Sequence, residues 1–306
     1  MTPLFQEPLL PSAKIAHLTD RALIRIAGDD AHHFLQNLVT ADVEETDANG
    51  ASSAALLTPQ GKILFDFLLY STGDGYVADV PAPAASDLLK RLTFYRLRAK
   101  VDLELLGTET GVFAVWDGPL EIDGALVAVT DPRTPLLGRR IIAPVAAMAG
   151  QADATGADLD DYERHRIATG VPEGLKDYSY SDIFPHDADL DQLGGVSFTK
   201  GCYVGQEVVS RVQHRGTARK RFVLVDGGRA LPEKGAPVTA HGKTIGELGS
   251  SIASETGESV GLALLRLDKV AQAKDNGSPL NCGDVEIEVR IPDWATFSLP
   301  EQNDPT

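Results

Sequence analysis

The chain has 306 residues, of which 43% are hydrophobic, so it is long enough to bury a full core and to form two or three domains. Its 28 basic and 44 acidic residues give a net charge of −16, and so acidic a surface repels the phosphates of nucleic acids. No stretch approaches the roughly 20 apolar residues of a membrane-spanning helix, and residues 1–14 lack the basic start and apolar run of a signal peptide. We therefore expect a cytoplasmic protein with neither nucleic-acid nor membrane partners.

The two cysteines, Cys202 and Cys282, are far apart and lie outside any CxxC pattern. This spacing argues against a disulfide scaffold and against a zinc or cluster site built from this chain alone. Any metal bound here would need ligands from another molecule.

The N-terminal part of the chain predicts two strands, at residues 14–18 and 22–27, followed by a helix. Asp29 or Asp30 is placed to cap that helix, because its carboxylate can accept hydrogen bonds from the free amides of the first turn.

Residues 51–106 are predicted to form a compact unit that resembles a ferredoxin-like fold. Turns rich in Gly, Pro and Asp separate its hydrophobic runs, and a proline at the start of a helix costs no hydrogen bond. The predicted elements are three strands, a helix that begins near Pro83 and a last strand, with the strands at residues 54–58, 62–70, 76–80 and 101–106. The unit has no Gly-rich phosphate loop, which leaves a P-loop or Rossmann nucleotide site without support.

Beyond this unit the pattern changes from mixed elements to mostly strands. Strands are predicted at residues 112–116 and 125–129, and a helix at 159–168 has acids in its first turn and bases later, as the helix dipole favours. Gly170 and Pro172 end that helix. The last part of the chain predicts a small antiparallel barrel, with strands at residues 222–225, 238–240, 243–248, 260–265 and 285–289.

One cysteine lies in the sequence FTKGCYVGQE, close to two glycines. Lys200, two residues before Cys202, is a cation of the kind that favours a thiolate, the form that attacks electrophiles or binds iron. A structural interpretation stays open, since single cysteines are commonly small buried hydrophobes. The six bases between residues 200 and 221, against the single acid Glu207, form either an anion site or a solvated surface.

Residues 200–207, KGCYVGQE, resemble the K-G-C-aromatic-x-G-Q-E signature of the YgfZ family of folate-binding proteins. Further matching segments come in the family's order, at residues 34–36, 40–43, 61–62, 166–172, 184–185, 189–190 and 194–198. Residues 187–216 also resemble the mitochondrial branch of that family, which assists late iron-sulfur assembly. The family is related in fold to the T-protein of glycine cleavage.

The resemblance implies an α+β protein with a three-domain, T-protein-like fold around a central tetrahydrofolate site. The folate-binding core would comprise residues 1–50 and 107–214, the ferredoxin-like unit residues 51–106, and the C-terminal antiparallel β-barrel residues 215–306. The implied function is that of a tetrahydrofolate-binding accessory protein that supports assembly or repair of iron-sulfur enzymes.

Carried over to this chain, the family's site predicts Cys202 as a reactive thiol, or as one ligand of an iron-sulfur cluster shared with a scaffold or carrier protein. The residues predicted to contact folate are Asp66, Lys200, Tyr203, Gln206, Glu207 and Arg211. Two of these have a structural alternative, because Asp66 is equally compatible with an exposed acid at a strand end and Tyr203 with packing in a strand.

Two departures from the T-protein pattern concern its carboxylates. The paired acids of the T-protein fall at Phe65 and Asp66, and the glutamate at its helix end falls at Ala168. A transferase that moves an aminomethyl group onto tetrahydrofolate needs carboxylates at the reacting nitrogens, so these replacements disfavour that reaction. Three alternatives stay open: a folate-dependent one-carbon transferase, an adaptor whose folate pocket is vestigial, and a cysteine hydrolase assisted by His186 or His214.

Overall fold

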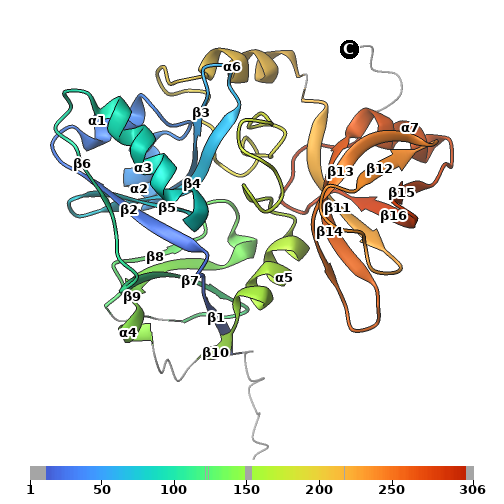
Figure 1. Cartoon of the computed structure of the whole chain (residues 1–306), viewed down its shortest axis with the longest axis horizontal. Coiled ribbons are helices and arrows are strands. Elements are labelled where there is room, and N and C mark those ends of the chain that lie inside the picture. Colours follow the sequence, from blue (N-terminus) through green and yellow to red (C-terminus); the bar gives the residue numbers. More distant parts are fainter. Residues whose placement is uncertain (1–11, 121, 123, 149–153, 217, 301–306) are drawn as a thin grey trace, which may run out of the picture.

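The computed structural model describes residues 12–120, 122, 124–148, 154–216 and 218–300. The strands form two five-stranded sheets and one closed barrel. In Figure 1 the two sheets lie on one side of the molecule and the barrel lies on the other, with the irregular segment that follows residue 170 running between them. This arrangement confirms the predicted α+β class and the C-terminal antiparallel barrel.

The first sheet has the strand order β10-β1-β7-β9-β8. Its strands are β1 (Ala13–His17), β7 (Thr110–Trp116), β8 (Val127–Thr130), β9 (Arg139–Pro144) and β10 (Ala154–Ala157). The prediction contains β1, β7 and β8 but neither β9 nor β10. β9 has no strand signal at its start because two arginines begin it, and the second of them, Arg140, is buried. A short 3-10 helix (Pro135–Leu137) and α4 (Val145–Met148) flank β9.

The second sheet is antiparallel and has the order β3-β4-β5-β2-β6. Its strands are β2 (Arg21–Ala27), β3 (Ala51–Leu57), β4 (Ile63–Thr72), β5 (Gly75–Pro81) and β6 (Asp102–Leu105). The sheet is larger than the predicted unit of residues 51–106, because β2 pairs with both β5 and β6. Such pairing between distant segments leaves no trace in a local pattern. The division into three domains with the predicted bounds stays a prediction.

Three helices, α1 (Ala31–Gln36), α2 (Val43–Asn49) and α3 (Ala82–Arg96), pack on one face of the second sheet around a shared hydrophobic core. α1 begins after Asp30, as predicted. The predicted capping bond is wrong, because the Asp30 carboxylate accepts instead from the amide of Lys100 at 2.7 Å.

The opposite face of the second sheet packs against the first sheet. Leu23, Leu68 and Tyr70 share one core with Ala114 and Trp116 of β7. The two sheets therefore form a stack, and polar groups that point into this stack are removed from water.

The barrel closes in the order β11-β14-β13-β12-β15-β16. Its strands are β11 (Lys220–Gly227), β12 (Pro237–Ala240), β13 (Lys243–Ala253), β14 (Ser259–Arg266), β15 (Leu280–Cys282) and β16 (Val285–Arg290). Each of the five predicted strands corresponds to one of these. The prediction lacks β15 and also α7 (Leu267–Asp275), which buries Leu267 and Val270 against the barrel.

Two further helices frame the segment between the sheets and the barrel. α5 (Leu159–Thr169) starts with a capping box between Asp158 and Asp161 and ends at Gly170, whose φ of +85° suits glycine. α6 (Gln206–Arg215) is not predicted, because a glycine precedes it where a Ser, Thr, Asp or Asn would signal a helix start. Figure 1 shows α6 lying across the ends of β3 and β4. In the described part of the chain, no helix combines the length and the apolar character needed to cross a membrane.

Candidate functional site

The loop before α6 presents Cys202 to solvent, whereas Cys282 is buried in the barrel. An exposed thiol can be reached by a reactant or a partner protein, as the predicted role of Cys202 requires. Burial raises the pKa of the Cys282 thiol, which suits a side chain that packs and does not react.

Lys200 anchors the first half of this loop. Its ammonium is buried and donates hydrogen bonds to the carbonyl oxygens of Val39 at 2.9 Å and Ala41 at 2.6 Å. Burial lowers the pKa of Lys200 to about 8, and the nearby Asp42 carboxylate opposes this shift. The ammonium of Lys200 therefore points to two backbone carbonyls after α1. In this position Lys200 anchors the loop, whereas the sequence predicted that it activates Cys202.

Tyr203 anchors the second half of the loop. Its ring is buried in the core between the sheets and the barrel, and the ammonium of Lys200 lies 5.4 Å from the ring centroid. Packing therefore holds Tyr203, as the structural alternative expected, although in a loop and not in a strand. The next turn needs a glycine, because Gly205 has a φ of +83° and a Cβ there would lie 2.6 Å from the carbonyl oxygen of Thr58. Between these fixed points the Cys202 side chain stays exposed.

Asp66 lies on β4 with its carboxylate buried, so the alternative of an exposed strand-end acid is wrong. The amide of Gly174 donates to its Oδ2 at 3.4 Å. Burial raises the pKa of Asp66, while the Tyr180 hydroxyl and the Arg21 guanidinium favour the charged form and limit the rise.

Asp66 Oδ1 and the Tyr180 hydroxyl are buried side by side, and the hydroxyl interacts with the carboxylate. The geometry between them falls short of a full hydrogen bond, and neither atom bonds to another described residue. Buried polar groups are nearly always hydrogen bonded, so a water or a ligand at this pair would complete their bonding. A pterin ring carries N–H donors that a carboxylate accepts, and the residues present therefore fit the reduced folate implied by the resemblance.

A network of buried ion pairs surrounds Asp66 and is not predicted. Glu173 lies at its centre, 2.9 Å from Arg133 and 3.1 Å from Lys176. Burial alone would raise the pKa of Glu173, but these cations and Arg21 hold it well below the usual range. Three further pairs complete the network, Arg21 with Asp79, Arg140 with Asp131 and Arg166 with Asp177. No local motif predicts the whole network, because the pairs Arg21–Asp79 and Arg133–Glu173 join residues 58 and 40 positions apart.

The structure does not gather the predicted residues of α6 around Asp66. Glu207 and Arg211 form an ion pair of 2.7 Å on the solvent-exposed surface of α6, one helical turn apart. Gln206 is half-buried in the first turn of the same helix. The side chains of Glu207 and Arg211 are thus paired with each other and stay in water.

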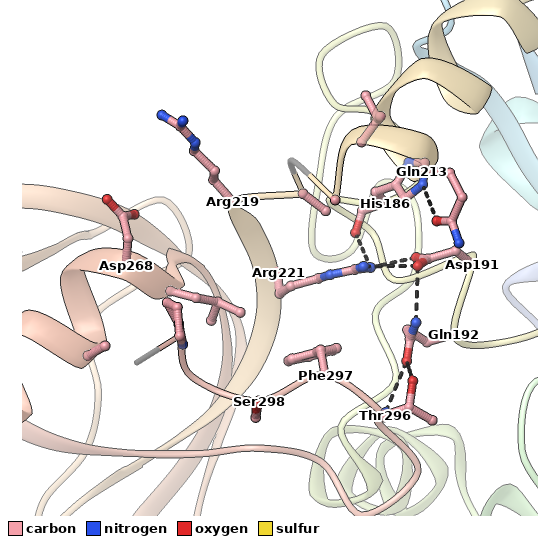
Figure 2. A pocket seen from close by; sticks show the side chains of 16 residues that line it. His186, Asp191, Gln192, Gln213, Arg219, Arg221, Asp268, Thr296, Phe297 and Ser298 are labelled. Atoms are coloured by element: carbon pink, nitrogen blue, oxygen red, sulfur yellow. Dashed lines mark hydrogen bonds and ion pairs between the residues drawn. The ribbon is translucent and has the colours of Figure 1, made fainter. Parts of the chain in front are cut away.

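The basic run between residues 200 and 221 is not one continuous surface. Lys200 is buried, and Arg211 is paired on α6. Arg221 binds Asp191 at 2.5 Å through one guanidinium nitrogen and lies 5.1 Å from the Phe297 ring, in the wall of a cavity of about 660 Å³ between the barrel and residues 186–192. Figure 2 shows Arg221 reaching toward Asp191 while Arg219 points away from it. The interpretation of the run as one anion site or one solvated surface is therefore wrong.

The histidines proposed for a cysteine hydrolase have other surroundings. His186 is buried with its Nε2 3.2 Å from Oε1 of Gln213, and His214 is exposed on α6. In the described part of the chain no hydrogen bond joins either ring to Cys202. Nor do the described residues include a group of three or more His, Cys, Asp or Glu side chains that could hold a metal ion.

These features define a protein of two stacked sheets and a C-terminal six-stranded barrel, with an exposed cysteine on a tightly anchored loop. Residues 219–297 match the family of the CAF17 C-terminal beta-barrel domain. The fold resembles the glycine cleavage system aminomethyltransferase T from Bartonella henselae, with a TM-score of 0.72, 17% identity and coverage of 93% of this chain and 86% of that chain. An identity this low supports the shared fold alone.

Sequence relatives identify the family. The human iron-sulfur cluster assembly factor IBA57 is 33% identical over 310 residues, covering 90% of this chain and 84% of the relative. The homologue from Pyricularia oryzae is 32% identical over 300 residues, covering 88% of this chain and 75% of the relative. The chain belongs to the IBA57 family of iron-sulfur cluster assembly factors. The predicted cytoplasmic location is wrong by this comparison, because both relatives are named as mitochondrial proteins.

Proposed function

We propose that this protein binds tetrahydrofolate at Asp66 and supports the assembly or repair of iron-sulfur enzymes through Cys202. The observation that carries the proposal is the exposed Cys202 held between two buried anchors, Lys200 and Tyr203. The sequence KGCYVGQE around it is also the segment that resembles the YgfZ family. The process in this proposal comes from the relatives, which are named iron-sulfur cluster assembly factors.

Cys202 acts in this proposal as a reactive thiol or as one ligand of a cluster shared with an iron-sulfur scaffold or carrier protein. Clusters are usually held by four thiolates, so the partner must supply the others. The backbone next to the thiol allows a close approach, because the space around Gly201 is open to at least 4 Å from a Cβ built there. The buried anchors fix the loop, so the thiol needs little ordering when the partner arrives.

Folate binding in this proposal rests on Asp66 and Tyr180. The buried carboxylate would accept hydrogen bonds from the N–H groups of the pterin, and the Tyr180 hydroxyl would donate to or accept from the same ring. Tyr180 also packs edge-on against Phe65, with ring centroids 5.5 Å apart. Tyr180 packs against the core of the second sheet and also against the core that contains Tyr203. Folate bound at Asp66 and Tyr180 would therefore lie next to both cores.

Aminomethyl transfer is the second candidate, and the residues present argue against it. Phe65 is part of the hydrophobic core beneath α1 to α3, and Ala168 lies on α5. Both stand where the T-protein pattern has acids, so the proton transfers at the reacting nitrogens would lack their carboxylates.

Titration of tetrahydrofolate into the purified protein tests the folate part of the proposal. A ligand that binds only the native state must raise its stability, by about 2.7 kcal/mol at a concentration of 100 times Kd. We expect heat of binding and a rise in melting temperature, with about 10- to 100-fold weaker binding in Asp66→Asn. An unchanged melting temperature at saturating folate would contradict this part and would favour an adaptor with a vestigial pocket.

A further inference from the structure

The segment from residue 90 to residue 100, which we call the basic α3 segment, differs in charge from the rest of the molecule. Its sequence, KRLTFYRLRAK, carries five bases and no acid, whereas the whole chain has a net charge of −16. The five are Lys90, Arg91, Arg96, Arg98 and Lys100. A local concentration of positive charge on an otherwise negative surface attracts the negatively charged face of a partner and orients it.

Two apolar side chains of this segment point into solvent. Phe94 is 71% exposed and Leu97 is 87% exposed, the two highest values among the large hydrophobic side chains that the structure describes. Leu97 also has a φ of +46°, a conformation that costs of the order of 1–3 kcal/mol for a residue with a side chain. Exposed apolar groups bordered by charge are typical of a protein-binding surface.

Four of the five bases of the segment are exposed and available to a partner, whereas Arg96 is half-buried and donates to the carbonyl oxygen of Val101 at 3.3 Å. Among the described residues, no acidic side chain pairs with Arg91 or Arg98. Lys90 pairs with Asp87 at 3.0 Å and Lys100 with Asp29 at 3.4 Å, but all four of these side chains are largely exposed. Exposed pairs of this kind contribute about 0–1 kcal/mol, so a partner's acids can replace them at little cost.

The segment lies next to the region that carries Cys202. A groove of about 490 Å³ separates α3 from the start of β4 and is lined by Leu64, Phe65, Asp87, Lys90, Arg91 and Phe94. Three residues before Leu64, a Cβ at Gly61 would lie 2.9 Å from Cβ of Val208 on α6. Three residues of strand span about 10 Å, so the groove begins close to where α6 and the Cys202 loop rest on the sheet. Figure 1 shows α3 on the face of this sheet and α6 across the ends of β3 and β4.

We propose that the basic α3 segment is the docking surface for an acidic, partly apolar face of the iron-sulfur carrier or scaffold protein that meets Cys202. This inference rests on the proposed function and specifies the partner's contact. Phe94 and Leu97 supply the apolar contact, and Arg91 and Arg98 supply the charge. A protein partner fits better than a nucleic acid, because the acidic surface around so small a basic segment repels a long phosphate backbone.

Affinity measurements with charge-reversal variants test this inference. The probe is the organism's own purified iron-sulfur carrier protein, both as apoprotein and loaded with a [2Fe-2S] cluster, titrated by calorimetry. We expect Arg91→Glu/Arg98→Glu to weaken binding of both forms by about tenfold or more, and to reduce its salt dependence. The matched control is Lys243→Glu/Lys269→Glu on the barrel, which changes the net charge equally and should bind as the unmodified protein does. The melting temperatures of both variants should stay unchanged.

The outcomes separate this inference from the proposed function. Equal carrier binding by Arg91→Glu/Arg98→Glu and the unmodified protein would overturn the docking surface and leave the role of Cys202 intact. Binding of a duplex oligonucleotide that Arg91→Glu/Arg98→Glu abolishes, with carrier binding unchanged, would also overturn it. Failure of the unmodified protein to bind either form of the carrier would contradict both proposals. Cys202→Ser should dock the apo carrier normally, because it leaves the basic α3 segment unchanged.

Discussion

The Lys200 ammonium donates a hydrogen bond to the carbonyl oxygen of Val39, 161 positions earlier in the chain, at 2.9 Å. This bond ties the loop that carries Cys202 to the end of α1, and the second bond to Ala41 fixes its direction. Lys200 therefore holds the motif KGCYVGQE in place, and this anchoring role cannot be read from the motif alone.

Lys200→Met tests this anchor through the pH dependence of stability. Burial lowers the pKa of Lys200 from 10.5 to about 8 in the folded protein, so between these values the unfolded chain holds more protons than the folded one. Raising the pH through this window therefore favours folding in the unmodified protein, and this gain is absent in Lys200→Met. Urea denaturation measures the free energy of unfolding of both proteins. We expect the value of the unmodified protein to increase relative to that of Lys200→Met between about pH 8 and about pH 10. Lys243→Met is the exposed control, and a difference that stays flat or shrinks with pH would contradict the buried anchor.

Cys202→Ala and Cys282→Ala are expected to have opposite effects. Cys202 is exposed, so its replacement should change the free energy of unfolding by less than about 0.5 kcal/mol while abolishing rescue of a deletion strain. Cys282 is fully buried in the barrel, so its replacement should leave a small cavity, cost about 1 kcal/mol and preserve rescue. The measurements are the activity of a [4Fe-4S] enzyme in the complemented strain and denaturation of each purified variant. Full rescue by Cys202→Ala, or lost rescue with a large loss of stability, would return Cys202 to a structural role.

Gly205→Ala is expected to disturb the loop more than Gly201→Ala does. Gly205 has a φ of +83° and no room for a Cβ beside Thr58, whereas the space around Gly201 is open. The first change should lower the free energy of unfolding by more than about 1 kcal/mol and the second by less than about 0.5 kcal/mol. Both are read from urea denaturation, and equal effects would mean that the tight contact at Gly205 does not hold the loop.

Asp66→Asn is expected to weaken tetrahydrofolate binding by about 10- to 100-fold, because a hydrogen bond to a charged group contributes about 1.5–3 kcal/mol. The raised pKa of Asp66 adds a pH dependence: the free carboxylate takes up a proton at a higher pH than an ordinary aspartate, so folate affinity should fall as the pH is lowered toward that value. Calorimetry at neutral and mildly acidic pH measures both effects, with Glu207→Gln on the exposed surface of α6 as the control. Unchanged affinity in Asp66→Asn would remove this residue from the folate site.

The strands and the barrel could be predicted from the sequence because their signals are local. Hydrophobic runs bounded by Gly- or Pro-containing turns predict β4 and β5, and Gly170 predicts the end of α5. α6 could not be predicted because Gly205 gives no capping signal and the valines that follow it favour a strand.

The candidate site was predictable only in part. Cys202 stands out because its neighbours form a specific motif, but nothing near Tyr180 or Glu173 in the sequence indicates that these side chains meet Asp66. Arg140 and Arg166 are fully buried, although arginine is usually exposed, and only the partners that the fold brings to them explain this. The basic run from 200 to 221 misleads for the same reason, because the fold places Lys200, Arg211 and Arg221 in three different surroundings.

Alkylation of Cys202 in the presence of the iron-sulfur carrier tests the central claim most directly. The free protein is treated with iodoacetamide alone, with the apo carrier and with the cluster-loaded carrier, and modification of each cysteine is quantified by mass spectrometry. Because Cys202 is exposed and Cys282 is buried, the free protein should be modified at Cys202 alone. The account predicts that the cluster-loaded carrier protects Cys202 and the apo carrier protects it less. The cluster's absorption should change when the unmodified protein binds the loaded carrier, and this change should be absent with Cys202→Ser. Equal modification of Cys202 in all three samples, with the same cluster absorption in the complexes of the unmodified protein and of Cys202→Ser, would contradict it.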